Sequence, residues 1–231
     1  MNKPITRGEW GRYVLRRPEA NFLQAPEWGT LHETLGSTVV RDVVLQDDKV
    51  VGGWQGIIKN ARRGRYLEVP GGPLLDWSRP KIARQAVLQM QKVAKEHKCV
   101  FIRIRPQIVD NDKHQAALYK LGFKKAPMHL HAEHTSMLDL TKTEEELLAG
   151  MRQQTRYEVK RAAKQDITVS WQSGEAAVDE FYKIQKVTAR RQKFVPSSLA
   201  FLRAEAQAFG DHIRIYRAEK DGVLLNLALV I

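Results

Sequence analysis

One segment of the chain carries cations at a spacing that suits the binding of an anion. A cation recurs at every fourth residue, at Arg152, Arg156, Lys160 and Lys164. If the segment is helical, such a row drifts by only about 40° per step, so the four cations share one broad face. This face is suited to a phosphate-bearing partner, and the alternative interpretation is an ordinary solvated helix surface.

A second cationic pair lies in the run FIRIRP. Arg103 and Arg105 alternate with apolar residues there, so both lie on one side of a strand together with Phe101. Paired arginines at the end of a strand are well placed to bind phosphate or carboxylate, and solubility is the alternative explanation. We identify no Ser-His-Asp or Cys-His set in the sequence, so the catalytic residues stay unknown.

Histidines cluster in MHLHAEHT, at His129, His131 and His134. Two histidines at i and i+2 share a strand face, which is compatible with zinc or iron. The segment has no cysteine and Glu133 as its only carboxylate, so we interpret it as a polar connector and expect no metal. The glycines of VPGGPLLD are followed by neither the Lys nor the Ser/Thr of a P-loop, which favours a tight turn.

The composition favours a basic, soluble protein. Lys and Arg number 38 against 26 acidic residues, which gives a net charge of +12 and favours phosphate-bearing partners: nucleic acid, nucleotide-linked substrates or anionic membrane surfaces. The single cysteine, Cys99, excludes an internal disulfide framework. We find neither the apolar region of a signal peptide nor a run of eighteen apolar residues, so we expect a cytoplasmic location.

The elements that must position these residues follow from hydrophobic periodicity. The first half predicts a hairpin, a strand, a helix, a strand and a short helix, at 39–45 with 50–58, 66–69, 79–98, 100–104 and 113–121. Residues 135–169 predict a strand, a helix of about twenty residues and a second strand, and Thr143 with Glu146 forms a capping box that fixes the helix start. The fold class expected is α/β (α+β) with a mixed sheet.

The two halves of the chain share a pattern. An amphipathic segment precedes a hairpin in both halves, VVRDVVL with VVGGWQGII and IRIYRAE with VLLNLALVI. This indicates a tandem repeat of one fold, with domains at 1–134 and 135–231. The second copy ends at Ile231 inside an apolar strand, so we expect it to be incomplete.

Several segments in order resemble the FemABX peptidyltransferases, the peptidoglycan bridge-forming aminoacyltransferases. They are NFLQAPEWGTLHETLG, YLEVPGGPLLD, and LGF followed by the connector MHLHAEHTSMLDL and TKTEEELLAGMRQQTRYEVKRAAKQ. The resemblance implies two tandem GNAT-like acyltransferase domains. It implies transfer of an amino acid from aminoacyl-tRNA to an amine on the stem peptide of a peptidoglycan precursor, UDP-muramyl pentapeptide or its lipid-linked form.

The resemblance also implies partners and site residues. We expect aminoacyl-tRNA and the precursor as partners, peripheral membrane contact and no stable protein partner. No Q/R-x-x-G-x-G/A stretch of the kind that binds coenzyme A occurs, and we expect no cofactor. His32 stands where family members have a substrate-binding Lys, and Val100 stands where a Tyr is expected before the retained Arg103 and Pro106. The family's catalytic lysine would fall beyond Ile231.

The substrate-binding residues that we expect are His32, Arg103, Arg105, Arg152, Arg156, Lys160 and Lys164. Two other functions stay open. One is a different tRNA-dependent aminoacyltransferase, with a protein N-terminus or a lipid head group as acceptor. The other is an inactive, basic RNA-binding fragment.

Overall fold

The computed structural model describes residues 5–62, 64–132 and 134–231, so Glu133 of the histidine connector lies outside the described residues. Contacts within the chain divide it into two compact units. The first comprises the residues up to Pro127 together with Arg203–Phe209, and the second comprises Met128–Leu202 and Gly210–Ile231.

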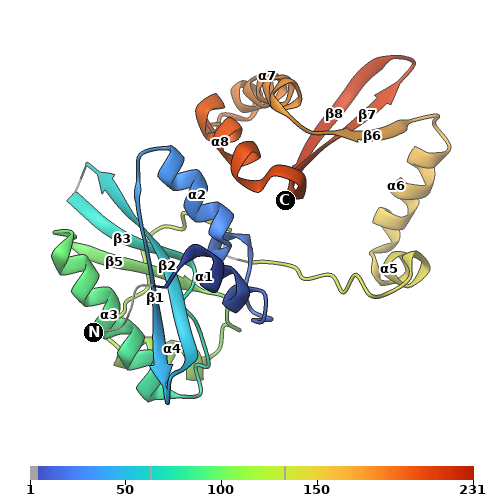
Figure 1. Cartoon of the computed structure of the whole chain (residues 1–231). Helices are drawn as coiled ribbons and strands as arrows, with labels where there is room; N and C mark the ends of the chain where they lie inside the picture. Colours follow the sequence, from blue (N-terminus) through green and yellow to red (C-terminus); the bar gives the residue numbers. More distant parts are fainter. Residues whose placement is uncertain (1–4, 63, 133) are drawn as a thin grey trace. The chain divides into compact units, whose positions relative to one another are not determined.

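A five-stranded mixed sheet is the centre of the first unit (Figure 1). Its strands are β1 (Thr38–Gln46), β2 (Lys49–Ala61), β3 (Gly64–Gly71), β4 (Leu74–Leu75) and β5 (Phe101–Pro106). The order is β1-β2-β3-β5, and β4 pairs with β2. β1, β3 and β4 run antiparallel to β2, whereas β5 runs parallel to β3. The mixed α/β class expected from the sequence is confirmed.

The hairpin of β1 and β2 forms where the sequence predicts it. Gln46 pairs with Lys49, and the two residues between them, Asp47 and Asp48, have φ values of 48° and 58°. Two successive left-handed residues make the turn whose twist matches that of paired strands. Asp tolerates this conformation better than most residues, so the turn fixes the register next to it, and an irregularity between Val44 and Leu45 shifts the pairing further along the hairpin.

Helix α3 (Pro80–Glu96) covers one face of this sheet and makes the parallel crossover from β4 to β5. Proline is the first helical residue, where its missing N–H costs nothing. The buried residues of α3 recur at helical spacing, as at Ile82, Ala86 and Met90. They pack with the side chains of Trp54 and Leu67, which are fully buried in the same cluster. This side of the sheet is the apolar core.

The opposite face is covered by the N-terminal elements α1 (Arg7–Val14), η1 (Phe22–Gln24) and α2 (Pro26–Thr34). Figure 1 shows α2 and α3 on opposite sides of the sheet. A capping box between Thr6 and Glu9 starts α1. After β5, α4 (Asp112–Lys120) begins at Asn111, whose side chain accepts from the His114 backbone N–H.

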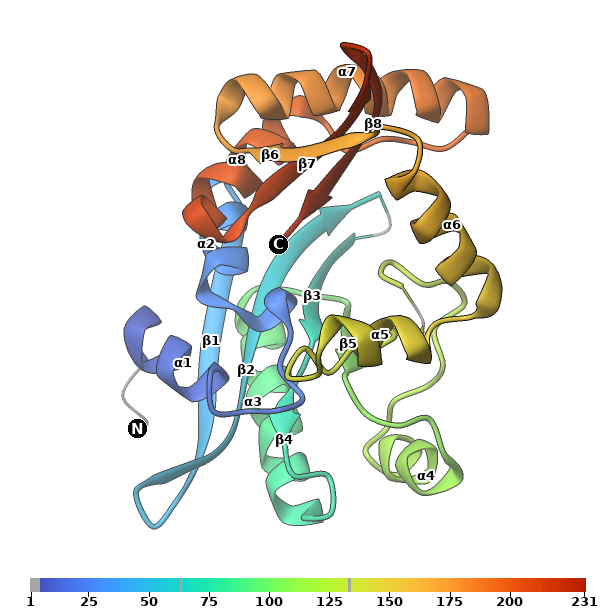
Figure 2. The same cartoon turned by 90° about the vertical axis from the view of Figure 1, so that its right-hand side faces the viewer.

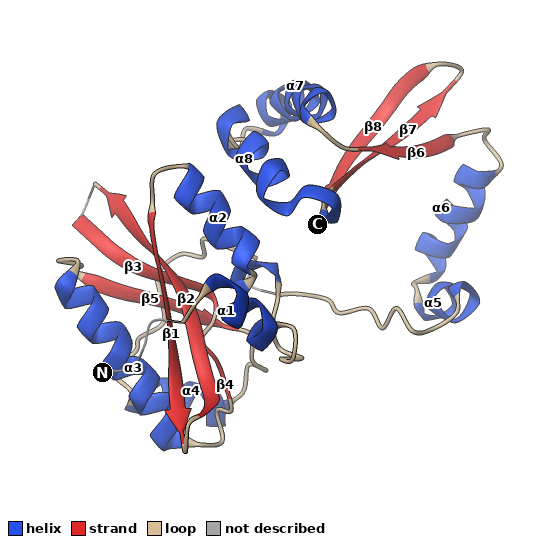
Figure 3. Ribbon diagram, viewed as in Figure 1, coloured by secondary structure: helices blue, strands red, loops and turns tan. Residues whose placement is uncertain are grey.

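The second unit has a three-stranded antiparallel sheet with the order β6-β7-β8 (Figure 3). Its elements are α5 (Glu144–Gly150), α6 (Gln153–Ala163), β6 (Thr168–Gln172), α7 (Glu175–Gln192), η2 (Gly210–His212), β7 (Arg214–Lys220) and β8 (Val223–Val230). Helix α8 (Leu199–Phe209) is divided between the units, since its residues from Arg203 on belong to the first. Helix α7 contacts β7 and β8 (Figure 2). Val178, Ile215 and Leu227 are buried in this unit. As the sequence pattern predicts, both halves contain a helix followed by a hairpin.

The expectation for residues 135–169 is partly wrong. Residues 135–140 form no strand, and the predicted helix is two helices, α5 and α6 (Figure 3). Met151 and Arg152 between them are extended, with ψ values of 158° and 149°. Gly150 precedes the break, and glycine is a weak helix former. The Thr143–Glu146 capping box is present as predicted.

None of the helices in the described part of the chain is both long and apolar enough to cross a bilayer.

Candidate functional site on the first sheet

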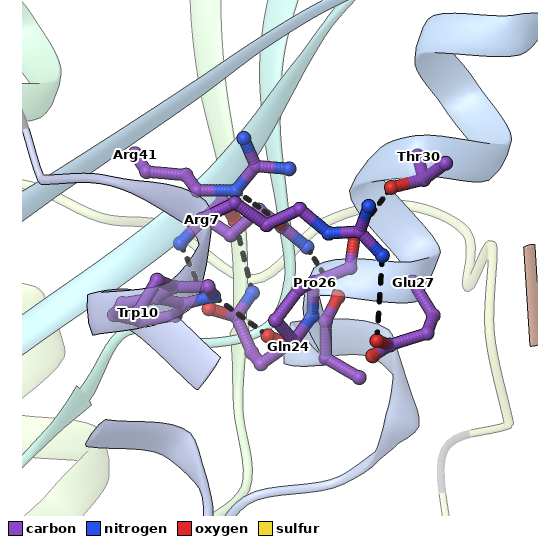
Figure 4. A network of polar contacts seen from close by, with 9 residues as sticks. Arg7, Trp10, Gln24, Pro26, Glu27, Thr30 and Arg41 are labelled. Atoms are coloured by element: carbon purple, nitrogen blue, oxygen red, sulfur yellow. Dashed lines mark hydrogen bonds and ion pairs between the residues drawn. The ribbon is translucent and has the colours of Figure 1, made fainter. Parts of the chain in front are cut away.

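Gln24 joins the start of α2 to the middle of the first sheet (Figure 4). Its Nε2 donates to the backbone oxygens of Gln55 at 2.9 Å and Pro70 at 2.6 Å, and its Oε1 accepts from the Gln55 N–H at 2.9 Å. Trp10 Nε1 donates to the Gln24 carbonyl at 2.8 Å. Because Gln24 is fully buried, these bonds are strong positional constraints on α2.

The side chain of Gln55 extends this network to β1. Its Nε2 donates to the Ala25 carbonyl at 2.9 Å, and its Oε1 accepts from Arg41 Nε at 2.6 Å. Burial lowers the pKa of Arg41, and the nearby Glu33 carboxylate opposes this effect. A Cβ on Gly29 of α2 would overlap both the Arg41 guanidinium and the Gln55 amide. Glycine therefore allows α2 to lie close against the sheet.

His32, one of the predicted binding residues, lies one turn further along α2 than Trp28. It is only 5% exposed, and the two rings meet edge to face with centroids 5.1 Å apart. Its Nδ1 lies 3.2 Å from Nζ of Lys59 on β2. An ammonium group has only donors, so Nδ1 is the acceptor when Lys59 is charged. The imidazole therefore holds the ammonium group of Lys59.

Charged and aromatic side chains surround Lys59 on the same face. Glu68 of β3 is 6% exposed. Burial lowers the pKa of Lys59, and the Glu68 carboxylate opposes this shift. Tyr66 is the cross-strand partner of Lys59. Its pKa is raised by burial and by Glu68, and the Arg103 guanidinium acts against that rise. These groups are therefore close enough to influence one another's protonation.

β5 brings the predicted arginines to this face. Its register aligns Arg103 with Glu68 and Phe101 with Tyr66, and paired residues of adjacent strands project to the same side. The rings of Tyr66 and Phe101 are stacked, with centroids 4.7 Å apart and planes 12° apart. Arg105 aligns with Pro70 two residues further along, and its Nη1 donates to Gln107 Oε1 at 3.3 Å. The predicted shared side of the two arginines is thus present.

We define the Lys59 cluster as His32, Lys59, Tyr66, Glu68, Phe101 and Arg103. It combines two cations and one carboxylate with a stacked ring pair. Phe101 is 46% exposed at the edge strand, so the cluster meets solvent on that side. Such a set can bind an anion and pack against the flat part of a ligand beside it.

Sequence reasoning missed Lys59 and Glu68. A signal for them exists in the run WQGIIKN, where Gln55, Ile57 and Lys59 alternate along β2 and face η1 and α2. Two polar residues four positions apart on one face of an otherwise apolar strand, Gln55 and Lys59, indicate that this face has its own polar partners. Glu68, inside the apolar run YLEVP, is the corresponding residue of β3.

The four predicted cations of the second unit do not form one helical row. Arg152 is the N-cap of α6 and Lys164 is its C-cap, so only Arg156 and Lys160 are helical. Arg156 Nη1 donates to the carbonyls of Ala149 at 3.3 Å and Met151, at the end of α5. Arg152, Lys160 and Lys164 are exposed. A substrate-binding role for these residues stays a prediction.

A sequence model of the FemAB family matches residues 5–119 and 115–222. The lipid II:glycine glycyltransferase of Staphylococcus haemolyticus is 25% identical over 209 residues, which cover 85% of this chain and 49% of that protein. The chain thus spans about half the length of this relative. The UDP-N-acetylmuramoylpentapeptide-lysine N(6)-alanyltransferase of Weissella viridescens is 22% identical over 231 residues, 91% of this chain and 68% of that protein.

Among solved structures, the crystal structure of FemX has a similar fold, with a TM-score of 0.78 and 22% sequence identity. The similarity covers 94% of this chain and 57% of that one. It therefore extends over both units of the chain.

Proposed function

The chain belongs to the FemAB family, and on that premise we propose that it is an aminoacyltransferase that acts on a peptidoglycan precursor. The observation that carries the proposal is the family match over both halves of the chain, together with relatives named as a glycyltransferase of lipid II and an alanyltransferase of UDP-N-acetylmuramoylpentapeptide. The acceptor is an amine on the stem peptide of such a precursor, and the donor is an aminoacyl-tRNA.

The reaction sets clear demands on the site. The acceptor amine, once deprotonated, attacks the carbonyl carbon of the aminoacyl ester and forms a tetrahedral oxyanion. This attack forms the C–N bond, and the ester C–O bond breaks when the oxyanion collapses to the amide. The tRNA leaves as its terminal alcohol after taking up the proton that the amine has lost. The protein must therefore hold two anionic substrates in line and stabilise the negative charge on oxygen.

The first sheet supplies groups for the first of these demands. Lys59, Arg103 and Arg105 share one face with a stacked aromatic pair. Guanidinium and ammonium groups bind phosphate and carboxylate by charge-assisted hydrogen bonds. The net charge of +12 also favours association with tRNA and with a phosphate-bearing acceptor. We place the reaction in the cytoplasm, where charged tRNA is made, with contact to the membrane surface when the acceptor is lipid-linked.

A transfer assay tests this proposal. The chain, and any longer product of the reading frame that encodes it, are each incubated with tRNA charged with a radiolabelled amino acid and with UDP-N-acetylmuramoylpentapeptide or lipid II, and labelled precursor is separated by chromatography. We expect label on the precursor and none when the tRNA has been deacylated. Glycine and alanine are the first amino acids to test, because the relatives transfer these two.

The alternative functions give different results in the same assay. Label on a protein or lipid head group, with none on the precursor, would assign the chain to another class of tRNA-dependent transferase. Binding of tRNA without transfer to any acceptor would favour an RNA-binding role. The exposed cations at Arg152, Lys160 and Lys164 are the observation that supports that role.

A further inference from the structure

Lys59 is an unusual residue for its position. It lies on β2 in line with Gln55 and Ile57, both of which are buried. A lysine at such a place loses hydration, and this disfavours its charged form. Lys59 nevertheless follows the buried stretch of β2 directly, and its ammonium group contacts His32 on α2. A role for the charge itself would explain this arrangement.

The contacts of Lys59 fix where its charge lies. One of the three N–H donors of the ammonium is used by His32 Nδ1 at 3.2 Å. The imidazole is itself held by the edge-to-face contact with Trp28. α2, which carries both rings, is tied to the sheet through Gln24 and Gln55. The position of Nζ is therefore set before any ligand binds, which lowers the entropic cost of binding.

The charges around Lys59 favour an anion. With His32 neutral, the Lys59 cluster contains Lys59 and Arg103 against the single carboxylate of Glu68, which leaves one net positive charge. Burial lowers the pKa of Lys59, and Glu68 acts to keep the ammonium protonated. At the open edge of the cluster, the Tyr66–Phe101 stack provides a flat apolar surface next to these charges. A phosphate group that is attached to a sugar or a base matches such a surface.

We propose that Lys59 is a substrate-binding residue whose ammonium group binds a phosphate oxygen of the acceptor's diphosphate, and that His32 is the positioning residue that holds this ammonium group in place. The inference rests on the proposed function, because it takes the acceptor to be a nucleotide- or lipid-linked peptidoglycan precursor. It assigns His32 a role through Lys59 in place of a direct contact with substrate.

Direct binding tests the proposal without relying on turnover. Isothermal titration calorimetry is performed on the full chain with UDP-N-acetylmuramoylpentapeptide, with UDP alone and with the muramyl pentapeptide that lacks the nucleotide. For Lys59→Met we expect Kd to rise about tenfold for the two diphosphate ligands, which corresponds to about 1.4 kcal/mol. The matched control is Lys49→Met, the same charge change at the exposed start of the same strand, for which Kd should stay within about twofold.

Two further substitutions separate positioning from folding. His32→Phe fills the ring site but removes the Nδ1 acceptor, so we expect it to weaken diphosphate binding as Lys59→Met does. His32→Asn places an amide oxygen close to the position of Nδ1 and should retain most of the affinity. Lys59→Arg keeps the charge and should fall between Lys59→Met and the unchanged chain. Thermal unfolding by circular dichroism shows whether each variant is folded, and Lys59→Gln, which also removes the charge, replaces Lys59→Met if the latter is not folded.

The results separate the roles of Lys59 and His32 from the proposed function of the whole chain. Tight binding of both diphosphate ligands by folded Lys59→Met would overturn the assignment of Lys59 while leaving the proposed function intact. A loss confined to the nucleotide-free pentapeptide would mean that Lys59 binds a carboxylate, and would overturn the phosphate assignment. Unchanged affinity in His32→Phe would overturn the positioning role. If the unchanged chain binds no precursor and transfers no amino acid, both the proposed function and the inference are wrong.

Discussion

The Lys59 cluster and the cations of α6 are two ways of presenting positive charge. In the first unit, Lys59 on β2 and Arg103 on β5 lie on either side of β3, which carries the buried Glu68 carboxylate. In the second unit, Lys160 and Lys164 lie on an exposed helix and its C-cap. A charge fixed by buried partners can select the geometry of a ligand, whereas exposed charges mainly attract an anion over a distance and lose strength with salt.

The two regions also differ in how many buried contacts hold them in place. Gln24 and Gln55 connect α2 to β2 and β3 through buried hydrogen bonds, and these bonds also place His32 beside Lys59. α6 buries none of its residues. We infer that substitutions in the first unit will change stability and ligand geometry together, and that substitutions in α6 will change mainly the electrostatics.

The largest expected effect is a loss of stability on Gln24→Leu. The change leaves the N–H and the carbonyl of Gln55 and the carbonyl of Pro70 without their Gln24 partner inside the protein. Each buried group that loses its partner costs about 1 kcal/mol or more, so we expect the unfolding free energy to fall by about 3 kcal/mol. Urea unfolding followed by tryptophan fluorescence measures it, because Trp10, Trp28, Trp54 and Trp77 all lie in the first unit.

The matched control is Gln165→Leu, the same substitution at an exposed residue just after α6. Its unfolding free energy should change by less than about 0.5 kcal/mol. If Gln24→Leu and Gln165→Leu lowered the unfolding free energy equally, the buried hydrogen bonds of Gln24 would not distinguish the first unit from α6.

Glu205 extends the comparison to a buried carboxyl group of the first unit. It is 8% exposed, and burial raises its pKa from 4.5 to about 7. The folded state therefore holds a proton that the unfolded state releases, so the stability that this gives is complete below pH 4.5 and is lost as the pH rises to 7. Glu205→Gln should remove this dependence and stabilise the protein by up to about 3 kcal/mol at pH 8, since a pKa difference of one corresponds to about 1.4 kcal/mol.

Urea unfolding at a series of pH values from 4 to 8 checks this expectation. The exposed Glu144 of α5 provides the matched control, because a change to Gln there removes a carboxylate that is not buried. If the unchanged protein and Glu205→Gln lose stability in parallel between pH 4.5 and 7, the carboxyl of Glu205 does not titrate with a raised pKa.

The regular elements of the first unit could be predicted because their signals are local. The β1–β2 hairpin follows from alternation and from the turn at Asp47 and Asp48, and α3 follows from the helical spacing of residues such as Ile82 and Met90. The break at Met151 could not be read from charge spacing. A row at every fourth residue looks the same whether the backbone continues as one helix or turns between two.

The site was only half predictable for a different reason. His32 and Arg103 stand out in the sequence, but Lys59 is defined by its contact with His32 on a separate helix and by the pairing of β2, β3 and β5, which puts it on the same face as Arg103. Register between β2, β3 and β5 sets which side chains share the face, and register is a property of the folded sheet. Gln24 likewise gains its importance only from the buried backbone groups that it meets.

A smaller effect is expected for the exposed cations in RNA binding. Neutralising Lys160 and Lys164 to Gln should lower the slope of log K against log salt by about 1.5 if both lysines contact phosphates of tRNA. Titrations with uncharged tRNA at several salt concentrations measure the slope. The control pair Lys49→Gln with Lys142→Gln removes the same charge from exposed positions outside α6. An equal change in both pairs would mean that only net charge matters.

The smallest effect is expected for Arg156→Ala. The guanidinium of Arg156 donates to carbonyls at the end of α5, so it supports the turn between α5 and α6 in addition to carrying charge. These carbonyls lie at a largely exposed turn where water can replace the lost donor, so the unfolding free energy should fall by less than about 1 kcal/mol. Hydrogen exchange should quicken in α5 and leave β2 and β3 unchanged. If the slope of log K against log salt for tRNA binding also falls by about 0.7, Arg156 contacts phosphate as well. In that case a cation held by hydrogen bonds in the second unit also binds an anion, and the difference between α6 and the Lys59 cluster is smaller than proposed.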